Sequence, residues 1–188
     1  MASRPKLTIS TTHDHLFDEF SKRYVSRKII GIEKASIIHL AYDNIKRMNV
    51  VIKINTDVSA FHHYINEINI LKHLKHDNIV KLLDSFIDER NQKVYIVLEY
   101  IDGMDMYNFL SIRKRLTETQ VIIFLQKIME TIQYCHSNGV CHRDIKCENI
   151  MVTSTGNIKI IDKINTQRLH GCPNRFLLFL GSSSSLTF

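Results

Sequence analysis

The sequence is poor in the residues that mark several classes of protein. Its 188 residues include no tryptophan, two prolines, six glycines and four cysteines. The cysteines Cys135, Cys141, Cys147 and Cys172 form no matching pair of C-x-x-C motifs, which argues against a zinc site. Three of them lie beside apolar residues, so we expect small buried thiols of a reducing compartment.

Long apolar runs and blocks of one charge are also absent. No segment approaches the ~18 apolar residues of a membrane-spanning helix, and residues 1–12 lack the apolar stretch of a signal peptide. The 25 Lys and Arg behind the net charge of +6 are scattered along the chain, whereas nucleic-acid-binding domains gather them on one face. We therefore expect no membrane or nucleic-acid partner and a cytoplasmic location; a nuclear one is compatible with these features.

The order of apolar patterns predicts an α+β protein. A hydrophobic content of 44% and a charged content of 23% are typical of a globular chain, with room for one domain or two small lobes. Residues 1–22 are polar and predict a flexible extension. Period-two and period-3.6 patterns then predict strands at 24–30, 37–42 and 49–54, a helix at 59–75, strands at 79–83 and 93–100, a helix at 117–137 and a hairpin joining 150–152 to 158–162.

The ends of the helix at 117–137 are the best defined. Thr117 and Gln120 have the spacing of a capping box, and the pair Asn138-Gly139 is typical of a left-handed cap at the other end.

Chemistry is concentrated in the run His142-Arg143-Asp144-Ile145-Lys146-Cys147-Glu148-Asn149. It carries a carboxylate at Asp144, an ammonium at Lys146 and a carboxamide at Asn149. Together these groups can accept a hydroxyl proton, neutralise a phosphate and hold a magnesium ion. The spacing H-R-D-x-K-x-x-N resembles the catalytic loop of protein kinases, and a lysine two residues after the aspartate is typical of serine/threonine kinases.

This resemblance extends over residues 28–162 and implies a two-lobed protein-kinase-like fold, nearest to the calmodulin-dependent and AMP-activated groups. The domain at 23–162 would have a complete β-rich N-lobe at 23–100 and a partial helical C-lobe at 101–162. The implied activity is transfer of the ATP γ-phosphoryl group to protein Ser or Thr, with ATP and Mg²⁺ as cofactors. A protein substrate or a regulatory protein is the implied partner.

The resemblance also implies the roles of the polar residues in and after this run. Asp144 would be the base that accepts the hydroxyl proton, and Lys146 would neutralise the phosphate in transfer. Asn149 and Asp162 would hold magnesium through hard oxygen ligands.

Lys53 and Glu67 are charges placed within apolar patterns. Lys53 interrupts the apolar run 50–54, and Glu67 lies on the apolar face of the helix at 59–75. Each charge would be costly to bury alone, and each is the natural partner of the other. The alternative is that both side chains extend to solvent. The resemblance implies that Lys53 binds the α- and β-phosphates of ATP and that Glu67 holds Lys53.

A second set of residues matches the adenosine pocket of the family. The resemblance gives the backbone of Glu99 and Ile101 to the adenine edge and the gatekeeper position to Leu98. Asp105 would bind the ribose or, equally, serve as a helix N-terminal charge. The apolar residues expected around the adenine ring are Ile38, Val51 and Met151.

The loop at 31–38 departs from the family pattern. Of the glycines in G-x-G-x-x-G-x-V only Gly31 is present, although glycine lets the backbone approach phosphates closely. Glu33 stands at the second glycine position. If it points inward, like-charge repulsion would weaken ATP binding on the order of a hundredfold; the alternative is that it points to solvent. Further along, the D-F-G triplet is replaced by Asp162-Lys163-Ile164.

After residue 164 the family's A-P-E triplet and following helices are missing, and 163–188 is expected to be a divergent tail. A truncated lobe would expose apolar residues of the helix at 117–137: Val121, Ile122, Leu125, Ile128, Met129 and Ile132. Three hypotheses follow from this pattern. The chain could be a working kinase, a nucleotide-binding pseudokinase that acts through a partner, or a shortened product of splicing or gene prediction.

Overall fold

The computed structural model describes residues 12–161, with the side chains from residue 18 onward. In chain order the elements are α1 (Thr12–Arg23), β1 (Tyr24–Glu33), β2 (Ser36–Asp43), β3 (Met48–Asn55), the short 3-10 helix η1 (Val58–Ala60), α2 (Phe61–His73), β4 (Leu82–Asp88), β5 (Lys93–Glu99), β6 (Gly103–Asp105), α3 (Met106–Arg113), α4 (Glu118–Ser137), η2 (Cys147–Asn149), β7 (Ile150–Thr153) and β8 (Ile158–Ile160).

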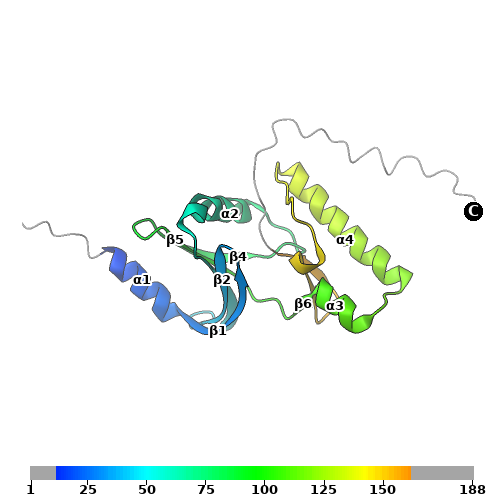
Figure 1. The fold of residues 1–188 in the computed structure, drawn as a ribbon, viewed down its shortest axis with the longest axis horizontal. Coiled ribbons are helices and arrows are strands. Elements are labelled where there is room, and N and C mark those ends of the chain that lie inside the picture. The colour runs from blue at the N-terminus through cyan, green and yellow to red at the C-terminus, as the bar shows by residue number, and fades with distance from the viewer. Residues whose placement is uncertain (1–11, 162–188) are drawn as a thin grey trace, which may run out of the picture.

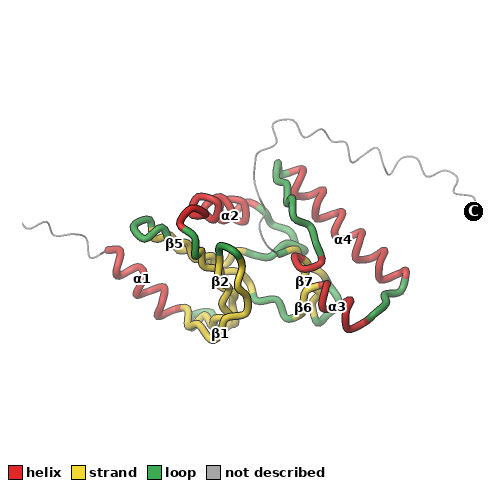
Figure 2. The backbone as a smooth tube through the Cα atoms, viewed as in Figure 1, coloured by secondary structure: helices red, strands yellow, loops and turns green. Residues whose placement is uncertain are grey.

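The N-terminal half is a five-stranded antiparallel sheet in the order β1-β2-β3-β5-β4. The C-terminal half contains a three-stranded sheet, β6-β7-β8, together with α3 and α4. Figures 1 and 2 show the two halves side by side, with α2 beside the larger sheet and α4 in the other half. The expectation of an α+β protein with two lobes is confirmed.

The larger sheet is covered on both faces, and the alternation of its side chains decides which residue faces which cover. On one face Ile96 and Leu98 pack with Tyr64 and Ile68 of α2. On the other face Val97 and its neighbours on β2 and β3 form a separate cluster, against which Phe20 of α1 packs.

Helix α1 corrects the expectation of a flexible extension over residues 12–22. Its last turn is held by Arg23, whose guanidinium bonds Asp43 at 2.9 Å and Asp84 at 3.0 Å. Phe20 stacks on Tyr24 with ring centroids 4.8 Å apart. Asp43 and Asp84 lie on strands 20 and 61 residues away in the sequence, so local polarity alone did not reveal them.

The strand predicted at 79–83 is also corrected, because β4 begins only at Leu82. Ile79 and Val80 are buried and pair instead with the other half of the molecule: Ile79 forms a parallel bridge with Ile160, and the Val80 N–H donates to the Ile160 carbonyl at 3.0 Å. The Ile160 N–H donates in turn to the Asn78 carbonyl at 2.7 Å. This apolar segment therefore joins the two sheets.

Helix α4 has the predicted bounds and caps. Thr117 and Gln120 make both hydrogen bonds of the capping box, and Gly139 has φ +71° as a left-handed cap requires. The hairpin of β7 and β8 is present as predicted, whereas β6 and α3 were not predicted. Strand β6 needs Gly103, because a Cβ there would lie 2.1 Å from the Val152 carbonyl oxygen.

One side of α4 is exposed, as expected for most of the six apolar residues named above. Val121, Ile122, Leu125 and Met129 are exposed, whereas Ile128 packs against the cluster of Phe124 and Ile158. Among the described residues, no helix is both long and apolar enough to cross a bilayer.

Candidate active site

Lys53 and Glu67 meet beneath the larger sheet. Lys53 lies in the middle of β3, and Glu67 lies on α2, which packs on that face. The Lys53 ammonium is 3.4 Å from the Glu67 carboxylate, and the two residues are 3% and 6% exposed. The expected pairing is therefore present, and the alternative that both side chains extend to solvent is wrong. A second carboxylate, that of Glu33, lies 3.7 Å from the same ammonium.

The orientation of Glu33 settles a question that the sequence left open. Glu33 is the last residue of β1, opposite Ser36 at the start of β2. Its side chain points inward to Lys53 and accepts a 2.7 Å hydrogen bond from the Ser36 hydroxyl. Glu33 keeps a side-chain exposure of 29%, whereas Ser36 is fully buried.

A cavity of about 480 Å³ opens beside this cluster, between the two sheets. It contains eight of the nine residues predicted to bind the cofactor: Ile38, Val51, Lys53, Glu67, Glu99, Ile101, Asp105 and Met151. The ninth, Gly31, is paired with Ile38 across the β1–β2 ladder and is not part of the cavity lining. The wall near Leu98 and Ile101 is apolar, while Lys53, Glu33 and Glu67 supply the charge at another part.

The segment after β5 is fixed by Glu99. Its carboxylate accepts hydrogen bonds from Lys159 Nζ at 2.6 Å and from the Lys81 N–H at 2.8 Å. Ile101 is buried two residues later. These contacts hold the backbone of 99–101 in place along the cavity, where the edge of a planar ring could meet it.

Asp105 caps helix α3. Its carboxylate accepts the Asn108 N–H at 2.8 Å and Asn108 Nδ2 at 2.6 Å. The helix-terminal role, one of the two expected for this residue, is therefore present. The same side chain lines the cavity, so a ribose contact stays a prediction.

The catalytic-loop residues form a compact polar cluster. Asp144 Oδ2 lies 3.0 Å from Lys146 Nζ and accepts a 2.9 Å hydrogen bond from Asn149 Nδ2. The same amide nitrogen donates to the Asp144 carbonyl at 2.8 Å. Asn149 is buried, whereas the side chains of Asp144 and Lys146 are about half exposed, at 51% and 48%. A buried amide thus bonds to a carboxylate that stays accessible to solvent.

Backbone strain accompanies this cluster. Arg143 has φ +62°, a left-handed conformation that non-glycine residues rarely adopt. Such a residue costs of order 1–3 kcal/mol and persists only where the surrounding structure imposes it. It immediately precedes Asp144, so the strained turn helps to direct the carboxylate outward.

Asp162, the predicted partner of Asn149 in metal binding, lies outside the described residues. The preceding residue, Ile161, donates its N–H to the Asn149 carbonyl at 2.9 Å. Ile161 also lines the cavity. The end of the described chain therefore runs beside both Asn149 and the pocket.

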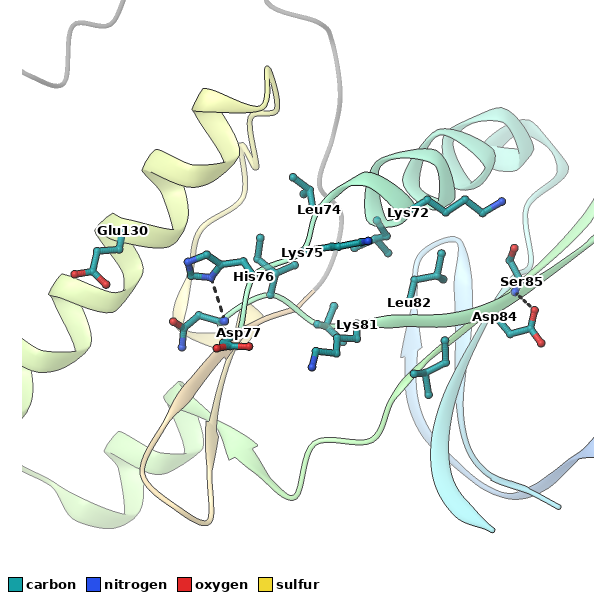
Figure 3. A pocket seen from close by; sticks show the side chains of 15 residues that line it. Lys72, Leu74, Lys75, His76, Asp77, Lys81, Leu82, Asp84, Ser85 and Glu130 are labelled. Carbon is teal, nitrogen blue, oxygen red and sulfur yellow. Dashed lines mark hydrogen bonds between the residues drawn. The ribbon is translucent and has the colours of Figure 1, made fainter. Parts of the chain in front are cut away.

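A second cavity of about 1080 Å³ lies along the end of α2, the segment 74–81 and α4 (Figure 3). Its labelled side chains include Lys72, His76, Asp77 and Glu130, and it shares the wall residues Leu71 and Val80 with the smaller cavity. None of the predicted site residues within 12–161 lines it. Size alone therefore does not identify the candidate active site; the smaller cavity is distinguished by the buried Lys53–Glu67 pair and by the predicted residues that line it.

The comparisons with known proteins agree with this geometry. The protein kinase domain family matches residues 24–169, which is more than half of the chain. The chain belongs to the protein kinase family. The two-lobed kinase-like fold and the kinase resemblance expected from the sequence are thereby confirmed.

Similar proteins include three named kinases. A probable serine/threonine-protein kinase MARK-B of Dictyostelium discoideum is 42% identical over 51% of this chain and 13% of its own length. An Aurora/IPL1-related protein kinase 2 of Caenorhabditis elegans is 36% identical over 71% of this chain and 45% of its own length. A NUAK family SNF1-like kinase 2 of Rattus norvegicus is 41% identical over 53% and 16%, respectively. The chain thus spans less than half the length of these relatives.

Ser36, Tyr64 and Gly103 are three of the residues near the site that were not predicted. Ser36 replaces the third glycine of the loop pattern. A polar residue at that position is the sequence feature that could have identified it. Tyr64 was assigned only to the apolar face of α2, yet its hydroxyl donates to the Ala35 carbonyl at 3.0 Å. Gly103 follows the segment that borders the cavity. A glycine just after a predicted strand is the sequence feature that could have identified it.

Proposed function

We propose that the smaller cavity binds ATP and that the chain carries the catalytic groups of a serine/threonine kinase, with Asp144 as the base. The observation that carries this proposal is the buried Lys53–Glu67 pair in the wall of a largely apolar cavity. An ion pair taken out of water is weak evidence for stability. Beside a pocket, however, the Lys53 ammonium of such a pair is a fixed cation that could bind a ligand phosphate.

The apolar part of the cavity fits a purine ring. Ile38 and Val51 come from the larger sheet and Met151 from the smaller one, so the ring would lie between the two lobes. The backbone of Glu99 and Ile101 would bond the edge of adenine, and Asp105 would accept a ribose hydroxyl while it caps α3.

The polar cluster of the catalytic loop would perform the transfer. Asp144 would accept the proton of a Ser or Thr hydroxyl as its oxygen attacks the γ-phosphorus, and Lys146 would neutralise charge on the phosphoryl group. Because Asn149 donates through its amide nitrogen to Asp144, its amide oxygen is the atom suited to a hard cation. Asn149 and Asp162 would hold Mg²⁺, which neutralises charge on the phosphates.

Protein substrates and a cytoplasmic or nuclear location are part of this proposal. The relative named as a probable serine/threonine-protein kinase supports the proposed protein substrates by analogy. Half-exposure of Asp144 is compatible with a substrate as large as a protein segment.

Transfer of labelled γ-phosphate from millimolar Mg-ATP to casein tests the proposal. Lys53→Met should abolish transfer, because the only cation of the buried Glu33–Lys53–Glu67 cluster is removed. Lys72→Met is the matched control, since Lys72 lies exposed on α2, near Glu67 but outside the cavity. Equal activity of wild type and Lys53→Met would contradict the proposed role.

A second candidate function is nucleotide binding without turnover, in a regulatory protein. The inward position of Glu33 favours it, because this carboxylate lies beside the cation proposed for the phosphates. The two functions separate in one pair of measurements. A regulatory protein would bind an adenine compound and transfer no phosphate, whereas a working kinase would do both.

A further inference from the structure

The turn between β1 and β2 is closed by the two residues that replace glycines. Glu33 and Ser36 face each other across the turn, and the buried Ser36 hydroxyl donates to the Glu33 carboxylate at 2.7 Å. The two departures from the family pattern are therefore complementary. One supplies a carboxylate and the other holds it.

Two further bonds attach the turn to the lobe beneath it. The Ala35 carbonyl accepts the Thr56 N–H at 2.9 Å and the Tyr64 hydroxyl at 3.0 Å. Burial raises the pKa of Tyr64 above its ordinary value, so the phenol keeps the proton that it donates. Neither Lys34 nor Ala35 has a positive φ, so the turn is made without glycine. Its bonds to Thr56 and Tyr64 attach it to the residue after β3 and to α2.

Two carboxylates already surround the Lys53 ammonium before any ligand arrives, so this cluster carries an excess negative charge. The ammonium lies 3.4 Å from Glu67 and 3.7 Å from Glu33, and all three side chains line the cavity. A triphosphate bound to Lys53 would bring several negative charges next to Glu33. At ~5 Å and an effective dielectric near 20, one such contact weakens binding on the order of a hundredfold before screening.

Among the described residues, the purine part of the pocket has a largely apolar lining. Its wall is formed by apolar side chains such as Val51, Leu98 and Met151. An uncharged nucleoside could fill this part and leave the Glu33–Lys53 contact intact. The same pocket thus disfavours the triphosphate of ATP and can accommodate its adenosine part.

We propose that Glu33 is a specificity-determining residue that makes this pocket select an uncharged purine nucleoside over a nucleoside triphosphate. The carboxylate takes the place of a ligand phosphate on Lys53, and Ser36 holds it there. This inference rests on the proposed function, since it needs the cavity to be a purine site with Lys53 at its phosphate end.

Isothermal titration of the purified 188-residue chain with adenosine and with ATP, with and without Mg²⁺, tests this selectivity. Wild type should bind adenosine at least as tightly as ATP, and the preference should be larger without Mg²⁺, because the triphosphate is then more negative. This comparison needs no variant to fold.

Variants then assign the selectivity to one side chain. Glu33→Gln should tighten ATP binding by tenfold to a hundredfold and change adenosine binding by less than about twofold. Ser36→Ala keeps the charge but removes the hydroxyl that holds it, so it should give a smaller gain in ATP affinity. Glu89→Gln, an exposed carboxamide substitution in the turn after β4, should change neither.

Two results overturn the inference in different ways. If wild type binds ATP tenfold more tightly than adenosine and Glu33→Gln leaves both affinities unchanged, the selectivity is absent and the purine pocket stands. If neither compound binds wild type or Glu33→Gln, the pocket is not a purine site, and the proposed function falls with the inference.

Discussion

The catalytic loop at 142–149 and the turn at 31–38 both belong to the proposed ATP site, but their side chains are used differently. In the catalytic loop the family's polar residues are all present, and the reactive side chains Asp144 and Lys146 are half exposed. In the turn, two glycine positions carry side chains, and these are used for packing: Ser36 is fully buried and Glu33 bonds to it. Under the proposed function, the catalytic loop keeps its side chains available for reaction, whereas the turn uses its side chains in contacts that oppose phosphate binding.

The largest expected effect concerns the catalytic loop and its role in phosphoryl transfer. Asp144→Asn should lower phosphoryl transfer on the order of a thousandfold, because an amide cannot accept the hydroxyl proton. The urea midpoint should stay within the range of an exposed substitution, since the side chain is about half exposed. Asp77→Asn, an exposed change outside the smaller cavity, is the control for transfer. A loss of less than tenfold would show that Asp144 is not the base.

The second prediction concerns stability at the buried cluster. Lys53→Met leaves the carboxylates of Glu33 and Glu67 close together without their cation, and removal of one partner of a buried pair costs about 3 kcal/mol. Urea unfolding should show this loss, whereas Lys72→Met on the exposed side of α2 should stay within about 0.5 kcal/mol. Equal stability of the two variants would mean that the cluster is solvated.

Glycine at both positions of the turn should remove the contacts that distinguish the turn from the catalytic loop. The double variant Glu33→Gly with Ser36→Gly should destabilise the chain by about 1–2 kcal/mol, because each glycine adds backbone entropy to the unfolded state. Differential scanning calorimetry measures this loss. ATP affinity, measured in parallel, should rise. A double variant that is as stable as wild type would show that the turn does not depend on its two side chains.

The smallest expected effect comes from the contact between α2 and the turn. Tyr64→Phe removes the hydroxyl that donates to Ala35 and should cost about 0.5–1 kcal/mol, the usual net value of a hydrogen bond. The cost stays small because the same carbonyl also accepts the Thr56 N–H. Tyr107→Phe, at an exposed tyrosine of α3, is the matched control. A loss above 2 kcal/mol would indicate a larger role for the phenol in the lobe.

Sequence reasoning succeeded where a residue's setting is local. The capping box at Thr117, the ion pair of Lys53 and Glu67, and the spacing within 142–149 all follow from patterns a few residues long or from the cost of burying a lone charge.

It failed where partners come from distant parts of the chain. Helix α1 is fixed by Asp43 and Asp84, and Ile79 pairs with Ile160 rather than with a neighbouring strand. The direction of Glu33 depended on Ser36 and Lys53 together, and no single-position pattern reveals such a three-residue arrangement. Asp162 stays a prediction, outside the described residues.

The bridge between Ile79 and Ile160 has a mechanical consequence. The two lobes are joined by the covalent segment at 100–102, by the paired backbone of 78–80 with 160, and by hydrogen bonds from Lys159 Nζ to Glu99 and from the Lys75 N–H to the Tyr134 hydroxyl. A relative rotation of the lobes that keeps these contacts must have its axis close to them, so the smallest displacements are expected there. Val80 and Ile160 would then keep their distance, while parts of the cleft farther from these contacts would open and close.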